Sequence, residues 1–446
     1  MGTLSDDAIR TTKNHAQHTS LDAVEGADWS SLPEDLLLII MAALDIPGLF
    51  RSGAVCNSWH DACSTFRRLR RPSPKQGPCL LYASDEYGPN HAAMYCPSTD
   101  TTFRVPFRHH GKGIFFSSNG WVFATDEAAD PYLLNPVTGA QATLPSVKTL
   151  PGIDTCKVNF VNDDGTVSAS ASEDFIEWAR DCAYCRVAIS TGHDAAATCT
   201  VLLVHMPDQK LSFAKPGDER WTLLSDELYM DDVRYNDKDS MFYGLHFDGS
   251  VYVIDLSEPS PVMTRIMCGV TTWGNPTKYL TITPSGELWQ VWRMWTVAGL
   301  KHRYTYQDVL RFTSEECIEF TGKDDDEKLG KLELDMEEDT VTTCKLLIFK
   351  VDVDRQKLVE LRSIGEHALF LGYNTAVCIP TMEFPAFESN RAYLSDDCSM
   401  YGPIIRRDLG IWNLEKRSLQ NLREAWPNLS SWLDLMAPIW ITPSLW

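Results

Sequence analysis

The stretch Trp29–Cys63 reads WSSLPEDLLLIIMAALDIPGLFRSGAVCNSWHDAC and carries the clearest helical pattern in the chain. Its motif Ser31–Glu34 has the form of a capping box, which predicts that a helix begins there. Leucine, isoleucine and methionine then recur at three- and four-residue spacing from Leu36 to Leu44, as an amphipathic helix requires. The sequence therefore predicts a first short helix that is capped by Ser31 and apolar along one face.

Two more short helices are predicted directly after the first. Pro47-Gly48 should end the first helix, because proline and glycine interrupt helical patterns. The second helix is expected over Leu49–Val55, and the third from Asn57 to about Phe66. So small a unit cannot bury its own apolar surface well. This apolar surface is therefore expected to pack against either the rest of the chain or another protein.

Composition limits the class of protein. The chain has 446 residues, 44% of them hydrophobic, so two or more folded domains are expected. Its formal net charge of −21 argues against nucleic acid or an anionic membrane surface as the main partner. The 13 cysteines are scattered and odd in number, which favours reduced thiols in the cytoplasm or the nucleus. Residues 1–27 are polar and show no secretory signal, so a disordered N-terminus is expected.

The region after the helical unit has a β pattern. Residues 71–78 are rich in proline and are expected to be a linker between residues 28–70 and a domain at 79–446. Alternating apolar runs flank turns such as Asp248-Gly249 and Pro284-Ser285-Gly286, which predicts hairpins. Gly249 and Gly286 are separated by nearly the length of a propeller blade. A β-propeller of about seven blades is therefore expected, with a β-sandwich as the alternative.

The helical unit resembles an F-box. The resemblance implies binding to a Skp1-like adaptor, and through it to a cullin scaffold. It also implies which residues form or support the adaptor-binding surface: Leu32, Pro33, Leu36, Ile40, Leu44, Leu49, Val55, Cys56 and Trp59.

The β region resembles a plant family in which an F-box precedes a kink-suppressed-type (KIB) β-propeller, formerly catalogued as a domain of unknown function. Three segments carry this resemblance: GEHALFLGYNTAVCIP at 365–380, NRAYLSDD at 390–397 and PIWITPSLW at 438–446. The two resemblances together cover nearly the whole chain after residue 28. They imply the fold class, a small all-α F-box of three short helices followed by a large all-β propeller.

Motifs for catalysis, metals or cofactors are weak in this sequence. Cys182 and Cys185 form a C-x-x-C pattern with His193, Cys199 and His205 downstream, but the spacings match no standard zinc module. Buried thiols are the favoured interpretation, and we expect no metal site. The acidic run Asp324–Asp339 lacks the ligand spacing of a calcium loop. No nucleophile elbow, phosphate-binding loop or dinucleotide fingerprint is present, so no catalytic residue and no cofactor are expected.

The hypothesis that best accounts for these patterns is a substrate-recognition subunit of a Skp1–cullin–F-box ubiquitin ligase. The F-box would bind the adaptor, and the propeller would bind a target protein through residues that the sequence does not identify. Such a subunit acts by proximity and needs no catalytic residue of its own. Two alternatives remain open: a non-ligase adaptor that binds a Skp1-like protein, and a propeller enzyme with a helical cap.

Overall fold

The structure is a computed structural model. It describes residues 28–68, 76–88, 90–107, 115–153, 159–161, 167–169, 172–190, 198–257, 260–270, 276–297, 341–395, 397, 409–426 and 438–444. The chain divides into two compact units, residues 1–74 and 75–446. The N-terminal segment 1–27, most of the expected linker, His193 and the acidic run Asp324–Asp339 lie outside the described residues. No helix of the described ranges is long and apolar enough to cross a membrane.

The first unit contains the three short helices that the sequence predicts. They are α1 (Glu34–Ala43), α2 (Ile46–Ser52) and α3 (Asn57–Arg68), after a 3-10 turn, η1 (Trp29–Ser31). Both α1 and α2 pack against α3, and η1 contacts α3 as well. The number of helices and the start of the third agree with the prediction, whereas the ends of the first two differ from it.

Proline positions explain these differences. Helix α1 is preceded by Pro33 as its N-cap, with ψ of 144° and no side-chain cap, so the predicted capping by Ser31 is wrong. A residue before proline avoids the helical region, and Leu32 is accordingly extended. Pro47 and Gly48 lie in the first turn of α2, where Asp45 accepts a hydrogen bond from the Gly48 amide at 2.7 Å. A proline in a first turn loses no helical hydrogen bond, so this pair begins a helix instead of ending one.

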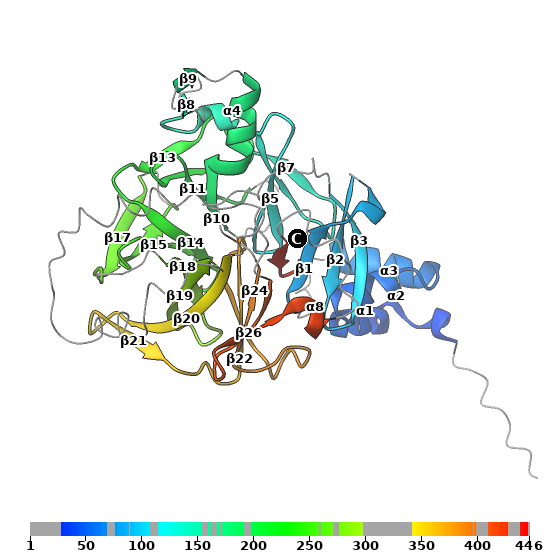
Figure 1. Ribbon diagram of the computed structural model, residues 1–446. Coiled ribbons are helices and arrows are strands. Elements are labelled where there is room, and N and C mark those ends of the chain that lie inside the picture. Colours follow the sequence, from blue (N-terminus) through cyan, green and yellow to red (C-terminus); the bar gives the residue numbers. More distant parts are fainter. Residues whose placement is uncertain are drawn as a thin grey trace, which may run out of the picture. The chain divides into compact units, whose positions relative to one another are not determined.

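The second unit is a β-propeller of six blades in the described residues, not the expected seven (Figure 1). Blade 1 joins the two ends of the unit through β27 (Ile439–Ile441), β1 (Cys79–Ala83), β2 (His91–Cys96) and β3 (Thr101–Pro106). Blade 2 contains β4 (Phe116–Ser118), β5 (Trp121–Thr125), β6 (Pro131–Leu134) and β7 (Gln141–Thr143). Blade 3 contains β10 (Tyr184–Ile189), β11 (Val201–His205), β12 (Lys210–Ala214) and β13 (Thr222–Ser225).

The remaining blades follow in chain order. Blade 4 contains β14 (Met230–Asn236), β15 (Met241–His246), β16 (Val251–Asp255) and β17 (Val262–Met267). Blade 5 contains β18 (Thr277–Ile282), β19 (Leu288–Val297), β20 (Val341–Asp352) and β21 (Lys357–Leu361). Blade 6 has five strands, in the order β23 (Val377–Pro380), β22 (His367–Leu371), β24 (Arg391–Leu394), β25 (Gly410–Asn413) and β26 (Ser418–Asn421).

Insertions occupy the length that a seventh blade would need. Residues 298–340 separate β19 from β20 within blade 5. Between blades 2 and 3 lie a 3-10 turn, η3 (Val147–Thr149), a small hairpin of β8 (Asn159–Val161) and β9 (Val167–Ala169), and helix α4 (Ser172–Trp178). Dividing the chain length by a typical blade length therefore overestimates the number of blades.

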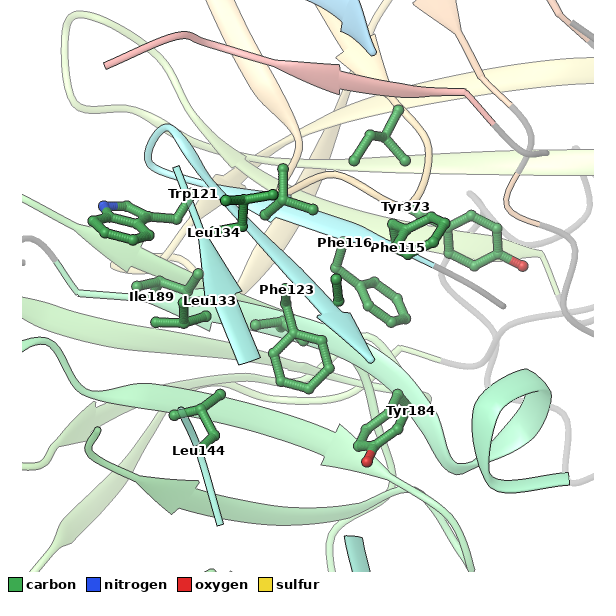
Figure 2. Packing of buried hydrophobic residues seen from close by; sticks show 14 of the residues in the cluster. Phe115, Phe116, Trp121, Phe123, Leu133, Leu134, Leu144, Tyr184, Ile189 and Tyr373 are labelled. Atoms are coloured by element: carbon green, nitrogen blue, oxygen red, sulfur yellow. The ribbon is translucent and has the colours of Figure 1, made fainter. Parts of the chain in front are cut away.

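The hydrophobic core lies between neighbouring blades. Strands β27, β4, β10, β14, β18 and β23 contact one another in this order, so they form the inner ring of the propeller. Figure 2 shows part of this core, where Phe123 packs against Tyr184 of blade 3 with ring centroids 5.2 Å apart. Phe116 packs edge-on against Tyr373 of blade 6 at 5.5 Å. Aromatic side chains thus connect consecutive blades, and they also connect blade 2 to blade 6, which is far away in the sequence.

Candidate functional site

The axis of the propeller is occupied by the turn between β22 and β23. The backbone N–H of Thr375 donates to the carbonyl of Ser117 in blade 2 at 2.8 Å, and its hydroxyl donates to the carbonyl of Val187 in blade 3 at 3.3 Å. The carbonyl of Ala376 accepts hydrogen bonds from Arg234 in blade 4 and from Thr281 in blade 5. Two consecutive residues that reach four other blades must lie near the axis. This turn therefore ties the inner strands of blades 2, 3, 4 and 5 to blade 6.

A buried network of charges lies beside this turn. The guanidinium of Arg186 on β10 lies 3.4 Å from Asp397 and 3.9 Å from Asp232 on β14. Arg293 on β19 pairs with Asp397 at 3.3 Å. The hydroxyl of Tyr279 on β18 also donates to Asp397, and the carboxylate of Asp232 accepts from the Leu280 amide at 2.7 Å. The network therefore joins strands of blades 3, 4 and 5 to the segment after β24 of blade 6.

The protonation of this network is consistent with a structural role. Burial raises the pKa of Asp232 to about 6, although Arg186 acts in the opposite direction. Burial alone would lower the pKa of Arg186, but the carboxylates of Asp397 and Asp232 raise it above its ordinary value. Burial also raises the pKa of Tyr279 well above its usual range, so this hydroxyl stays protonated. Each carboxylate has basic or hydrogen-bonding partners, as buried charges require.

The cysteines and histidine considered as zinc ligands do not come together as a metal site in the described residues. Cys182 is exposed, Cys185 is half-buried and Cys199 is buried. Burial raises the pKa of Cys185 to about 12 and of Cys199 to about 11, so both remain thiols. His205 already uses both ring nitrogens in hydrogen bonds within the protein, to the Met206 carbonyl and the Ser212 hydroxyl.

The helical unit has its own small core. Its buried side chains come from all three helices and include Leu37, Leu38, Met41, Ile46, Leu49, Ala62, Cys63 and Phe66. The indole N–H of Trp59 donates to the Trp29 carbonyl at 2.8 Å, and the Ser58 hydroxyl donates to the Ser30 carbonyl at 2.9 Å. These bonds fix η1 against α3, which places Trp29 at the surface of the unit.

Among the described residues of this unit, four large apolar side chains are exposed. The exposed fractions are 61% for Trp29, 47% for Leu36, 61% for Ile39 and 62% for Val55. Leu36 and Ile39 lie three positions apart, so they share one face of α1, opposite the buried Leu37, Leu38 and Met41. A short helix that is apolar on both faces requires a second packing partner in addition to the core of its own unit. The exposed row of α1, with the exposed Trp29 and Val55, supplies the candidate adaptor-binding side chains.

The nine residues implied by the F-box resemblance fall into three groups. Pro33, Leu36 and Val55 are exposed, and Leu49 is fully buried. Five are half-buried: Leu32, Ile40, Leu44, Cys56 and Trp59. Leu49 lies in the core of the unit, so it can support the surface only indirectly. The adaptor-binding role of all nine remains a prediction.

Two exposed residues, Trp29 and Ile39, are absent from that prediction. The unbroken apolar run from Leu36 to Met41 is a signal for Ile39, because a helix with only one apolar face would not need so many consecutive apolar residues. Trp29 lies before the first helix, where helical periodicity gives no information. Its exposure depends on the hydrogen bonds that hold η1 against α3.

Comparisons with known proteins agree with this division of the chain. Residues 29–72 match the family described as F-box-like. The "Putative F-box protein At5g55150" of Arabidopsis thaliana is 22% identical over 95% of this chain and 99% of its own length. The "Probable F-box protein At4g22165" of the same plant is 21% identical over 97% and 99%.

Among solved structures, TolB from Acinetobacter baumannii shares 10% identity over 87% of this chain and 72% of its own, with a TM-score of 0.36. A score this low carries no argument. The family described as "KIB1-4 beta-propeller" matches residues 94–413, which is most of the propeller. The chain therefore belongs to the KIB1-4 β-propeller family and carries an F-box-like unit in front of its propeller.

Proposed function

We propose that this chain is the substrate-recognition subunit of a Skp1–cullin–F-box ubiquitin ligase. The exposed apolar side chains of Trp29, Leu36, Ile39 and Val55 are the observation that carries the proposal. When a partner covers apolar side chains with this much exposed surface, the free energy of the system falls, which favours binding. The F-box-like match implies that this partner is a Skp1-like adaptor.

The propeller is proposed to hold the target protein. The charged side chains of the buried network pair with one another, as groups that hold a fold together do. A bound target is kept near the ubiquitin carrier, so its lysines react at a high effective concentration. The chain then promotes the reaction without catalysing it.

Adaptor binding can be tested with the full-length chain and a Skp1-like adaptor of Arabidopsis thaliana. The double substitution Leu36→Asp/Ile39→Asp puts two charges on the exposed face while the buried residues of α1 stay unchanged. We expect binding, measured by calorimetry, to weaken by tenfold or more, about 1.4 kcal/mol. Ser64→Asp is the control, since Ser64 is exposed on α3 and is not part of the Leu36–Ile39 row, and this variant should bind normally. Normal binding by the double variant would refute the proposed adaptor surface.

The ligase role needs a second measurement, because a non-ligase adaptor would bind Skp1 equally well. Full-length chain with Leu36→Asp/Ile39→Asp should still capture its target but no longer deliver it to the cullin. In excess, this variant should lengthen the half-life of a copurifying protein and reduce its ubiquitination. Unchanged half-lives of all copurifying proteins would favour the non-ligase adaptor. Chemical conversion of a partner by the variant would favour an enzyme.

A further inference from the structure

Two aromatic side chains at one end of blade 4 are unusually exposed. Tyr229 is 43% exposed and Phe247 is 48% exposed, and their ring centroids lie 6.1 Å apart. Among the described residues of the propeller, no other aromatic side chain reaches this exposure. Leaving two rings in water is unfavourable, so two exposed rings in contact indicate an interaction surface.

Hydrogen bonds hold this pair in place. The Phe247 amide donates to the Tyr229 carbonyl at 3.0 Å, which ties the segment before β14 to the turn between β15 and β16. Within that turn the Asp248 carboxylate lies 2.7 Å from the His246 ring and accepts from the Ser250 amide at 2.7 Å. Gly249 has φ of +84°, a conformation that other residues adopt with strain. A surface that is already ordered loses little entropy when it binds.

The two segments that carry the pair are rich in carboxylates. Residues 225–231 and 246–250 contain four carboxylates, those of Asp226, Glu227, Asp231 and Asp248, and no lysine or arginine. Asp231 pairs with the buried Lys278 at 2.9 Å, whereas Asp226 and Glu227 are exposed three and two positions before Tyr229 in the sequence. Exposed carboxylates next to aromatic rings attract a cation that is also flat and weakly hydrated. An arginine side chain has these properties, because its guanidinium stacks on rings and pairs with carboxylates.

We propose that Tyr229, Phe247, Asp226 and Glu227 form a docking patch for an arginine-bearing segment of the target protein. This proposal rests on the proposed function, since it names the chemistry by which the propeller holds its target. A second copy of this chain is a poorer occupant, because two such patches would bring carboxylates against carboxylates. The acidic surface equally disfavours nucleic acid.

A random peptide library displayed on phage, selected against the full-length chain, tests this patch without knowledge of the target. We expect the selected peptides to be enriched in arginine next to apolar residues and to bind less tightly at high salt. Acidic peptides, peptides without basic residues, or no selected peptide would overturn the proposal.

Substitutions then locate the binding. We expect two variants to bind a selected peptide about tenfold or more weakly in fluorescence polarisation. They are Phe247→Ala and the double substitution Asp226→Asn/Glu227→Gln. Met382→Ser is the matched control, because Met382 is 80% exposed on the propeller and lies outside the patch. Equal binding by Phe247→Ala would overturn the proposal. So would a dimer in sedimentation velocity that Phe247→Ala dissociates, since the occupant would then be a second copy.

The two proposals fail separately. Phe247→Ala should keep its binding to the Skp1-like adaptor, and Leu36→Asp/Ile39→Asp should keep its binding to the selected peptide. Loss of peptide binding with normal adaptor binding therefore concerns the patch alone. Normal peptide binding with no adaptor binding by the unmodified chain would contradict the proposed function and leave the patch in place.

Discussion

His205 illustrates how a single residue that looks chemically active is used for structure. It lies on β11 without exposed surface, and its Nδ1 faces the Met206 carbonyl at 2.8 Å. A carbonyl can only accept, so Nδ1 donates and Nε2 accepts from the Ser212 hydroxyl at 2.9 Å. The neutral ring therefore satisfies all of its hydrogen bonds inside blade 3.

This arrangement predicts a pH dependence of stability. Burial lowers the pKa of His205 from 6.5 to about 4, so the unfolded chain binds this proton more readily than the folded one. The stability from neutral His205 is fully present above pH 6.5 and is lost as the pH falls towards 4, by up to about 3 kcal/mol. In urea unfolding, the destabilisation caused by His205→Gln should therefore shrink between pH 7 and pH 4.5. Met382→Ser, at an exposed propeller residue that does not titrate, should show no such change. If the difference in unfolding free energy between the unmodified chain and His205→Gln stays constant with pH, the neutral state of buried His205 is contradicted.

Helices and turns could be predicted from the sequence where short stretches of neighbouring residues determine them. The helices of the first unit follow from apolar spacing, and Asp248-Gly249 and Pro284-Ser285-Gly286 form hairpin turns as expected, with Gly286 at φ of +94°. However, these turns are not equivalent. Gly249 follows the second strand of blade 4, whereas Gly286 follows the first strand of blade 5. The true period appears in the inner strands β10, β14 and β18, which begin about 46 residues apart.

The placement of β22 and β23 could not be predicted in this way. Strands β22 and β23 form an antiparallel hairpin within residues 365–380, but β22 also pairs in parallel with β24, and the turn between β22 and β23 lies near the axis. This position depends on partners such as Ser117 and Val187, which are far away in the sequence. Likewise, the exposed face of α1 follows from its apolar run, whereas the contact of Tyr229 with Phe247 requires the folded blade.

The charge network on the inner strands predicts how much stability is lost when one of its charges is removed. Arg186→Met leaves Asp232 and part of Asp397 without their cationic partner in a buried site. We expect a loss of about 3–5 kcal/mol in the free energy of unfolding. Adding Asp232→Asn should recover part of it, because one uncompensated carboxylate is then removed. The control is Arg355→Met, whose side chain is 80% exposed beside Asp352 and should cost less than about 1 kcal/mol. An equally small cost for Arg186→Met would show that the network does not stabilise the ring.

At the scale of the whole propeller, the ring is closed by strands from both ends of the unit. Strand β27 pairs antiparallel with β1, with Cys79 opposite Ile441 and Leu81 opposite Ile439. The side chain of Trp440 is 1% exposed and packs against Phe370 of blade 6 at 5.1 Å. The Ser117 hydroxyl of blade 2 donates to the Trp440 carbonyl. One strand thus joins blades 6, 1 and 2.

The closure strands lie outside the residues that match the propeller family. The match covers residues 94–413, so it omits β1, β26 and β27 and begins within β2. A fragment cut at these limits would lose most of blade 1 and expose the aromatic neighbours of Trp440, among them Phe370 and Tyr393. We expect residues 94–413 to unfold without a cooperative transition or to aggregate, whereas residues 76–446 should show a β-type circular dichroism spectrum and one cooperative transition. In the longer fragment, Trp440→Ala should cost about 3–5 kcal/mol and Trp440→Phe clearly less. Cooperative unfolding of residues 94–413, with a midpoint equal to that of the longer fragment, would mean that the ring does not need its closure strands.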